Sequence, residues 1–185
     1  FNYLGWFGKT DAVEHGEELK KEGWDVYVRG SSAFSTLGWF KDPVLSTMIS
    51  KGEYSYGDLV NVILHESVHA TIYVNGQSYF NESLASYVAD RLTYDYIAEF
   101  RGKDTDEYRA YHKKEQWSKK RGKKLNQAYE KLDQLYRSSL ADSEKLVKKA
   151  KILSQLKGEL KWKAEMNNAT LIQFKTYGVG DREFS

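Results

Sequence analysis

His65, Glu66 and His69 form an H-E-x-x-H motif, the pattern in this chain best suited to chemistry on a metal ion. Residues four apart lie on one face of a helix, so both imidazoles can converge on one ion. Glu66 follows the first imidazole and can reach a water molecule held by that ion. Because zinc lowers the pKa of a bound water to about 7, a carboxylate can take its proton near neutral pH. The motif therefore predicts hydrolytic zinc chemistry.

A catalytic zinc site takes three protein ligands and keeps one position for water. The chain has no cysteine, so the third ligand must be nitrogen or oxygen. Glu82 is the candidate, because the twelve residues between it and His69 accommodate a helix end, a turn at Asn75-Gly76 and the start of another helix. We therefore predict one Zn²⁺ per chain, bound by two histidines and a glutamate.

Two helices should position these ligands. Apolar residues three and four apart predict a helix over about residues 56–74, which carries the motif, and a second over about 80–100, which carries Glu82. Ser78 or Asn81 can cap the second helix. Asp90 lies eight residues beyond Glu82 on roughly the same face, where it either hydrogen-bonds a ligating histidine or faces solvent.

The other elements predict an α+β fold. Residues 11–22 form a short charged helix that Gly23 ends, and the alternating residues 24–28 and 33–37 form two strands. From about 105 to 165 the pattern is helical and charged with a break near 138–142, which indicates a helical hairpin. We expect a single domain over 1–185, with a mainly helical zincin-like core, a small antiparallel sheet and a long basic hairpin over about 103–165.

Charge and length restrict the partners. The net charge is +2, but residues 1–100 hold 7 Lys and Arg against 14 Asp and Glu, while residues 101–165 hold 19 against 10. The basic block could attract phosphates or anionic membranes, but lysines on a solvated helical face are the favoured interpretation, and no nucleic-acid partner is expected. No signal peptide or membrane-spanning run is present. The chain begins at Phe1 without a methionine, which predicts that an upstream part is missing.

Several ordered blocks resemble the bacterial predicted aminopeptidase family, which is gluzincin-like. They are residues 35–47, 65–69, 73–76, 80–83 and 167–169, followed by Phe174 and Tyr177. The resemblance implies a zinc peptidase that acts on peptides in the bacterial envelope or periplasm. It also implies that membrane association would come only from an N-terminal anchor, which this chain lacks. The Gly-x-Met-Glu-Asn segment of well-known gluzincin aminopeptidases is absent, so endopeptidase activity stays open.

The same blocks indicate supporting residues. Tyr177 is the first choice to stabilise the oxyanion, ahead of Tyr73 and Tyr79, although a packing role fits Tyr177 equally well. Ser35 and Thr36 lie in a segment along which an extended peptide could bind. Asn168 either binds the substrate backbone or caps a helix. The alternative function is a non-catalytic, zinc-containing binding domain of peptidase-like fold, and the sequence does not indicate an oligomeric state.

Overall fold

The computed structural model describes residues 4–31, 33, 36 and 42–177, with side chains described as far as Ile172. Its elements are α1 (Lys9–Lys21), the short 3₁₀ helix η1 (Ser46–Met48), α2 (Ser55–Thr71), α3 (Ser78–Phe100), α4 (Asp106–Arg137), α5 (Asp142–Glu159) and α6 (Asn168–Tyr177). The described part of the chain forms two compact units. One consists of residues up to Gly30 together with 120–175, and the other consists of residues from Ser31 to Lys119 with the end of α6.

The predicted α+β class is wrong, because the described residues contain helices and no strand. Residues 24–28 have no regular secondary structure, and Val26 and Val28 lie against α1. A β-carbon on Gly16 would come within 2.9 Å of Val28 Cγ2, so this glycine lets the segment approach the helix. The carbonyl of Val26 accepts its hydrogen bond from the side chain of Asn167 at 2.9 Å. The second predicted strand, 33–37, lies largely outside the described residues.

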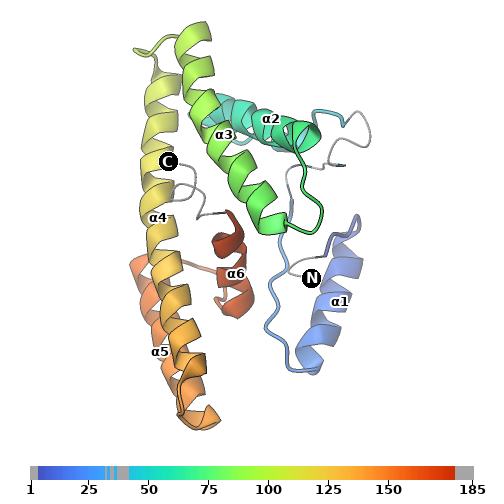
Figure 1. Ribbon diagram of the computed structural model, residues 1–185, viewed down its shortest axis with the longest axis vertical. Coiled ribbons are helices and arrows are strands. Elements are labelled where there is room, and N and C mark those ends of the chain that lie inside the picture. The colour runs from blue at the N-terminus through green and yellow to red at the C-terminus, as the bar shows by residue number, and fades with distance from the viewer. Residues whose placement is uncertain (1–3, 32, 34–35, 37–41, 178–185) are drawn as a thin grey trace. The chain divides into compact units, whose positions relative to one another are not determined.

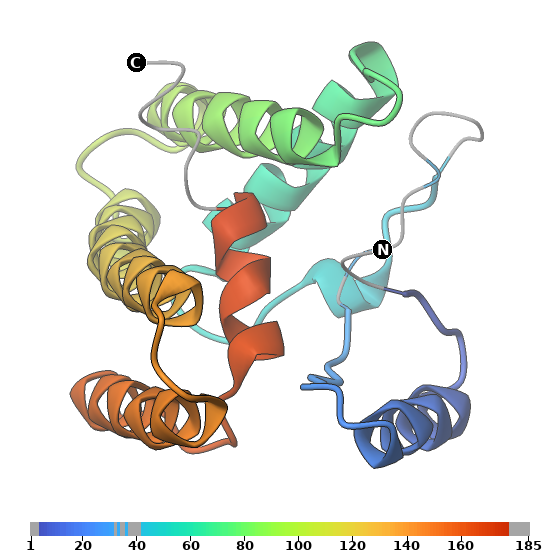
Figure 2. The same ribbon diagram turned by 60° about the horizontal axis from the view of Figure 1, so that its bottom comes forward.

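The predicted helical hairpin is present in the unit that contains residues 120–175. The C-terminal part of α4 lies beside α5 (Figure 2). The helical structure is interrupted between Arg137 and Asp142, as expected. Both helices contribute to one apolar core, which also takes in residues beyond α5. Its buried members are Leu125, Ala128, Leu132, Leu135, Leu153, Leu156, Met166 and Leu171. Leucine and alanine three and four apart on α4 make this seam, as helix packing requires.

In the other unit, α2 and α3 form a helical hairpin joined by residues 72–77 (Figure 1). Both helices lie close to their predicted ranges. Small residues on α3 are fully buried, among them Ser83, Ala85 and Ala89, so the two backbones can approach closely. Tyr111 of α4 packs against Gly57 of α2 and is fully buried. The hairpin therefore has a partner on α4, which holds α2 in place.

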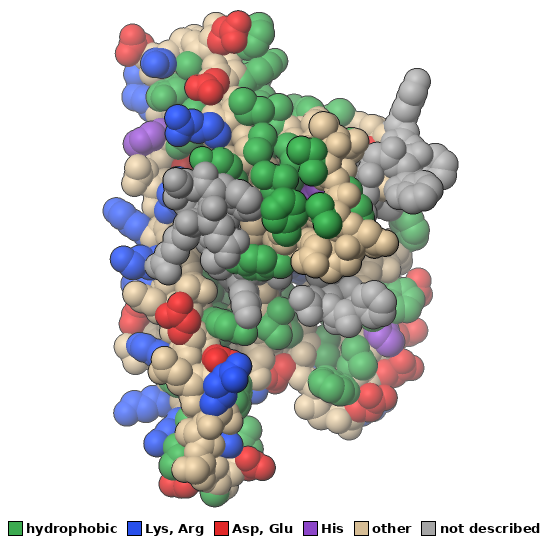
Figure 3. Space-filling view, in the orientation of Figure 1, with side chains coloured by type: hydrophobic (Ala, Val, Ile, Leu, Met, Phe, Trp, Pro, Cys, Tyr) green, Lys and Arg blue, Asp and Glu red, His purple; other side chains and the backbone are tan. Residues whose placement is uncertain are grey.

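Lysine and arginine side chains gather over α4, as Figure 3 shows. Lys119, Lys120 and Lys123 are exposed there, in agreement with a solvated helical face. Among the helices of the described residues, none combines the length and the apolar character needed to cross a bilayer.

Candidate metal centre

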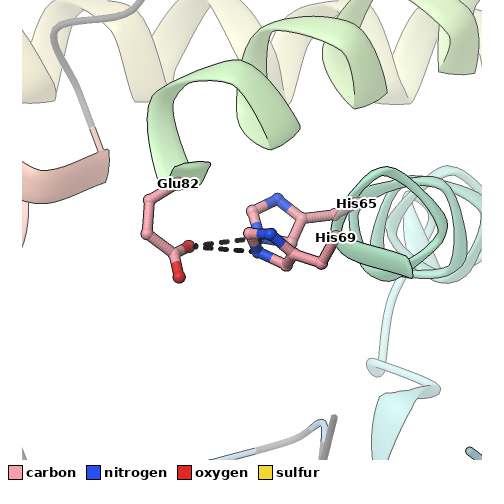
Figure 4. A group of neighbouring side chains, drawn as sticks. All are labelled: His65, His69 and Glu82. Carbon is pink, nitrogen blue, oxygen red and sulfur yellow. Dashed lines mark hydrogen bonds and ion pairs between the residues drawn. The ribbon is translucent and has the colours of Figure 1, made fainter. Parts of the chain in front are cut away.

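The two histidines of the motif lie one turn apart near the end of α2. Their Nε2 atoms are 3.1 Å apart, and the rings meet edge to face with centroids separated by 4.7 Å. The side chain of His65 is 16% exposed and that of His69 only 3%. Because the residues are four apart on one helix, both imidazoles point toward the same region beside α3 (Figure 4).

Glu82 enters this region from the second turn of α3. Its Oε2 lies 3.3 Å from His65 Nε2 and 3.6 Å from His69 Nε2, and its side chain is 12% exposed. One donor atom from each of the three residues lies within 4.8 Å of the others. The structure thus brings together the three predicted ligands, and this group could hold a metal ion. No fourth His, Cys, Asp or Glu joins them within the described residues.

The spacing of the donors can be compared with a zinc site. Ligand bonds of about 2.0–2.1 Å around a tetrahedral zinc place neighbouring donors roughly 3.3 Å apart. The three separations in the group are 3.1, 3.3 and 3.6 Å. Two imidazole nitrogens and one carboxylate oxygen also form a donor set used by catalytic zinc. The residues therefore fit Zn²⁺ in both spacing and chemistry.

Electrostatics link Glu82 to the imidazoles. Burial raises the pKa of Glu82, but its polar contacts with the imidazoles of His65 and His69 outweigh burial and lower the pKa to about 2. Burial lowers the pKa of His69, but the contact with Glu82 and the charge of Glu82 outweigh burial and leave that pKa above its usual value. The carboxylate is therefore ionised, and a proton on His69 is stabilised when no other cation is near.

Glu66 lies between the two histidines in the sequence of α2 and is half-buried. After burial and the contact and charge of Glu82, the charge of Glu66 also contributes to raising the pKa of His69. A carboxylate beside a metal centre, but outside its ligand set, is the arrangement that general-base chemistry needs.

Asp90 has a different partner from the one considered in the sequence. Its carboxylate accepts a hydrogen bond from Asn61 Nδ2 at 2.9 Å, and the same amide group also donates to Tyr111 at 3.0 Å. Nδ1 of His69 is buried and has no hydrogen-bond partner among the described residues. Asn61 lies one turn before His65 on α2. Through the amide of Asn61, Asp90 of α3 is linked to α2 and to Tyr111 of α4.

The remaining predicted residues have local contacts of their own. Thr36 donates from its backbone nitrogen and its hydroxyl to Asp42, at 2.7 and 2.8 Å. Asn168 begins α6 in the other unit, and its Oδ1 accepts a hydrogen bond from Tyr136 at 3.0 Å. Ser35 lies outside the described residues, as does the side chain of Tyr177. The roles given to these residues stay predictions.

Asn81 is the residue whose role the sequence did not reveal. Considered above only as a helix cap, it is buried inside α3 and hydrogen-bonds the backbone of Val74 through both polar atoms of its amide. The available signal was its position directly before a ligand, together with the known tendency of asparagine to bind nearby backbone.

Comparison with known proteins gives one match. The model of a family described as "Putative aminopeptidase" matches residues 1–185. No curated protein and no solved structure matches the chain.

Proposed function

Because the chain belongs to the "Putative aminopeptidase" family, we propose that it is a zinc-dependent peptidase whose centre is formed by His65, His69 and Glu82. The observation that carries the proposal is the convergence of three donors from α2 and α3 at separations of 3.1 to 3.6 Å. Family membership supports the class of reaction, and the donor set supports its dependence on a metal ion.

Each protein residue has a separate part in the reaction. A zinc ion held by His65, His69 and Glu82 would supply Lewis-acid polarisation and would lower the pKa of a water ligand to about 7. Glu66 accepts the proton of the attacking water and then delivers it to the nitrogen of the leaving amine. His65, His69 and Glu82 hold the centre at a fixed place beside Glu66. Tyr177 stays the candidate that would stabilise charge on the substrate oxygen.

Two measurements on the purified protein test the proposal together. Elemental analysis should find about one zinc per chain, the content expected of a single three-ligand site. Cleavage of peptides should stop when a chelator removes the metal and return when zinc is added. Zinc binding without cleavage of any peptide would instead support a non-catalytic binding domain.

Substrates with a free and with a blocked N-terminus distinguish the two modes of cleavage. An aminopeptidase, as the family description has it, releases the first residue only from peptides with a free amine. Cleavage of blocked peptides at internal bonds would identify an endopeptidase. Both outcomes use the same metal centre, so the comparison addresses specificity separately from chemistry.

A further inference from the structure

Asn81 joins the start of α3 to the segment that follows α2. Its Oδ1 accepts a hydrogen bond from the backbone nitrogen of Val74 at 2.9 Å, and its Nδ2 donates to the carbonyl of Val74 at 2.8 Å. Asn81 is only 2% exposed, so both bonds are shielded from water. A single side chain therefore satisfies the donor and the acceptor of one backbone residue.

These bonds lie between the two parts of the metal centre. Val74 follows His69 by five residues, and Asn81 directly precedes Glu82. Between them the chain turns through Gly76, whose φ of 74° suits glycine, and Gln77 donates its backbone N–H to Val74 at 3.2 Å. The segment that connects His69 to Glu82 therefore contains a turn, and the side chain of Asn81 hydrogen-bonds to Val74 within this segment.

The hydrogen bonds of Asn81 matter for the metal centre because Glu82 belongs to a different helix than the two histidines. A glutamate side chain has three rotatable bonds, and its oxygen must stay near both imidazoles to act as a ligand. The register of α3 against the end of α2 decides whether it can. Residues that orient metal ligands commonly change metal affinity by about 10- to 100-fold when they are replaced.

We propose that Asn81 is a positioning residue, which holds Glu82 at the distance from His65 and His69 that metal binding requires. The inference rests on the proposed metal centre, and it assigns to Asn81 no contact with metal or substrate. Asparagine is suited to the role, because aspartate lacks the donor and glutamine is longer by one methylene.

Asn167 provides a matched control for a purely structural role. Its Oδ1 accepts a hydrogen bond from the backbone nitrogen of Thr170 at 3.1 Å, and its Nδ2 donates to the carbonyl of Val26. The amide therefore fastens backbone in the same manner as Asn81, but in the other unit. Replacing Asn81 by alanine removes two hydrogen bonds, and replacing Asn167 removes three, because Asn167 Oδ1 also accepts from the hydroxyl of Thr170 at 3.1 Å. Only the change at Asn81 should affect the metal centre.

The experiment compares Asn81→Ala, Asn81→Ser and Asn167→Ala with the parent protein. Zinc affinity is measured by competition with a chromophoric chelator, and thermal unfolding of the metal-free proteins is recorded beside it. Both alanine variants should unfold at lower temperature. Only Asn81→Ala should lose about 10- to 100-fold in zinc affinity, and Asn81→Ser, which can keep one hydrogen bond, should lose less. The visible spectrum of the Co²⁺-loaded protein should also change in the Asn81 variants, because coordination by Glu82 is altered.

Unchanged zinc affinity and an unchanged cobalt spectrum in the Asn81 variants would overturn the inference. If Asn81→Ala fails to fold, the same readings on Asn81→Ser decide the matter. An equal loss of affinity in Asn167→Ala would overturn it as well, since the effect would then follow stability alone. A parent protein that binds zinc and cleaves no peptide would contradict the proposed peptidase and leave these comparisons valid. A parent that binds no zinc would contradict both.

Discussion

Oε2 of Glu82 lies 3.3 Å from Nε2 of His65, although the two residues belong to different helices. The distance equals the separation expected of neighbouring ligands in a tetrahedral zinc site, roughly 3.3 Å. Coordination by Glu82 thus requires both a negative charge and a side chain of the right length. A substitution can change the length and keep the charge.

Replacing Glu82 by Asp keeps the charge and shortens the side chain by about 1.5 Å, one carbon–carbon bond. Zinc affinity should fall by about tenfold or more, because a displaced ligand should cost at least as much as a lost orienting residue. Titration with zinc against a competing chelator measures the change. The control is Glu99→Asp, which alters an exposed glutamate on the same helix. Equal affinity in Glu82→Asp and the parent would show that Glu82 is not a ligand.

Replacing Glu66 by Gln should separate metal binding from turnover. The amide keeps the size of the side chain but cannot accept the proton of water, so kcat should fall by roughly 10²- to 10⁴-fold. Zinc content should stay at the parent level, because Glu66 is not among the three grouped donors. Elemental analysis and steady-state kinetics on the same preparation give both values. A Gln variant with full activity would remove Glu66 from its proposed role.

Gly57 and Gly122 should respond to alanine in opposite directions. A β-carbon on Gly57 would overlap the ring of Tyr111, while one on Gly122 meets nothing within 4 Å. Gly57→Ala should therefore cost roughly 1–3 kcal/mol of unfolding free energy through overpacking. Gly122→Ala should add about 0.5–1 kcal/mol, because alanine is the better residue in a helix interior. Urea unfolding of both variants measures the signs, and a stabilised Gly57→Ala would contradict the packing of Tyr111 on α2.

Glu115 should make stability depend on pH. It is 7% exposed, and burial, followed by the negative charge of Asp90, raises its pKa to about 7, while Lys114 and Lys119 act in the opposite direction. The folded protein therefore binds this proton more tightly than the unfolded chain. The unfolding free energy should be highest below the usual pKa of 4.5 and should fall as the pH rises toward 7. The loss is on the order of 3 kcal/mol.

Urea unfolding at about pH 5 and about pH 8 tests this linkage. In Glu115→Gln, which does not ionise, the difference between the two conditions should shrink by the same amount. A variant with the full pH dependence of the parent would show that other groups cause it.

The sequence predicted the grouping of His65, His69 and Glu82 because its signals are local. The histidines are four apart, the turn at Asn75-Gly76 is short, and Glu82 follows within a few turns of helix. The helices around them follow from apolar spacing alone. In these segments the apolar spacing predicts both the helix and the face of the helix on which the candidate ligands lie, so neighbouring residues are sufficient for the prediction.

The errors arose where a pattern depends on distant partners. Residues 24–28 alternate between apolar and polar, as a strand does, but they pack on α1 at Gly16. The carbonyl of Val26 accepts a hydrogen bond from Asn167, which is far away in the sequence. The two hydrogen bonds between Asn81 and Val74 use the backbone of Val74, so the residue type at position 74 does not predict them.

All the proposed ligands and the proposed base lie between His65 and Glu82, on one helical hairpin. In terms of chain entropy, an ion bound there is a cross-link that closes a very short loop, for which little conformational freedom must be lost. Contacts of such short range form early in folding, before distant segments meet. The centre can therefore assemble as soon as α2 and α3 have formed, and a metal ion that binds it would stabilise this hairpin as a folding nucleus for its unit.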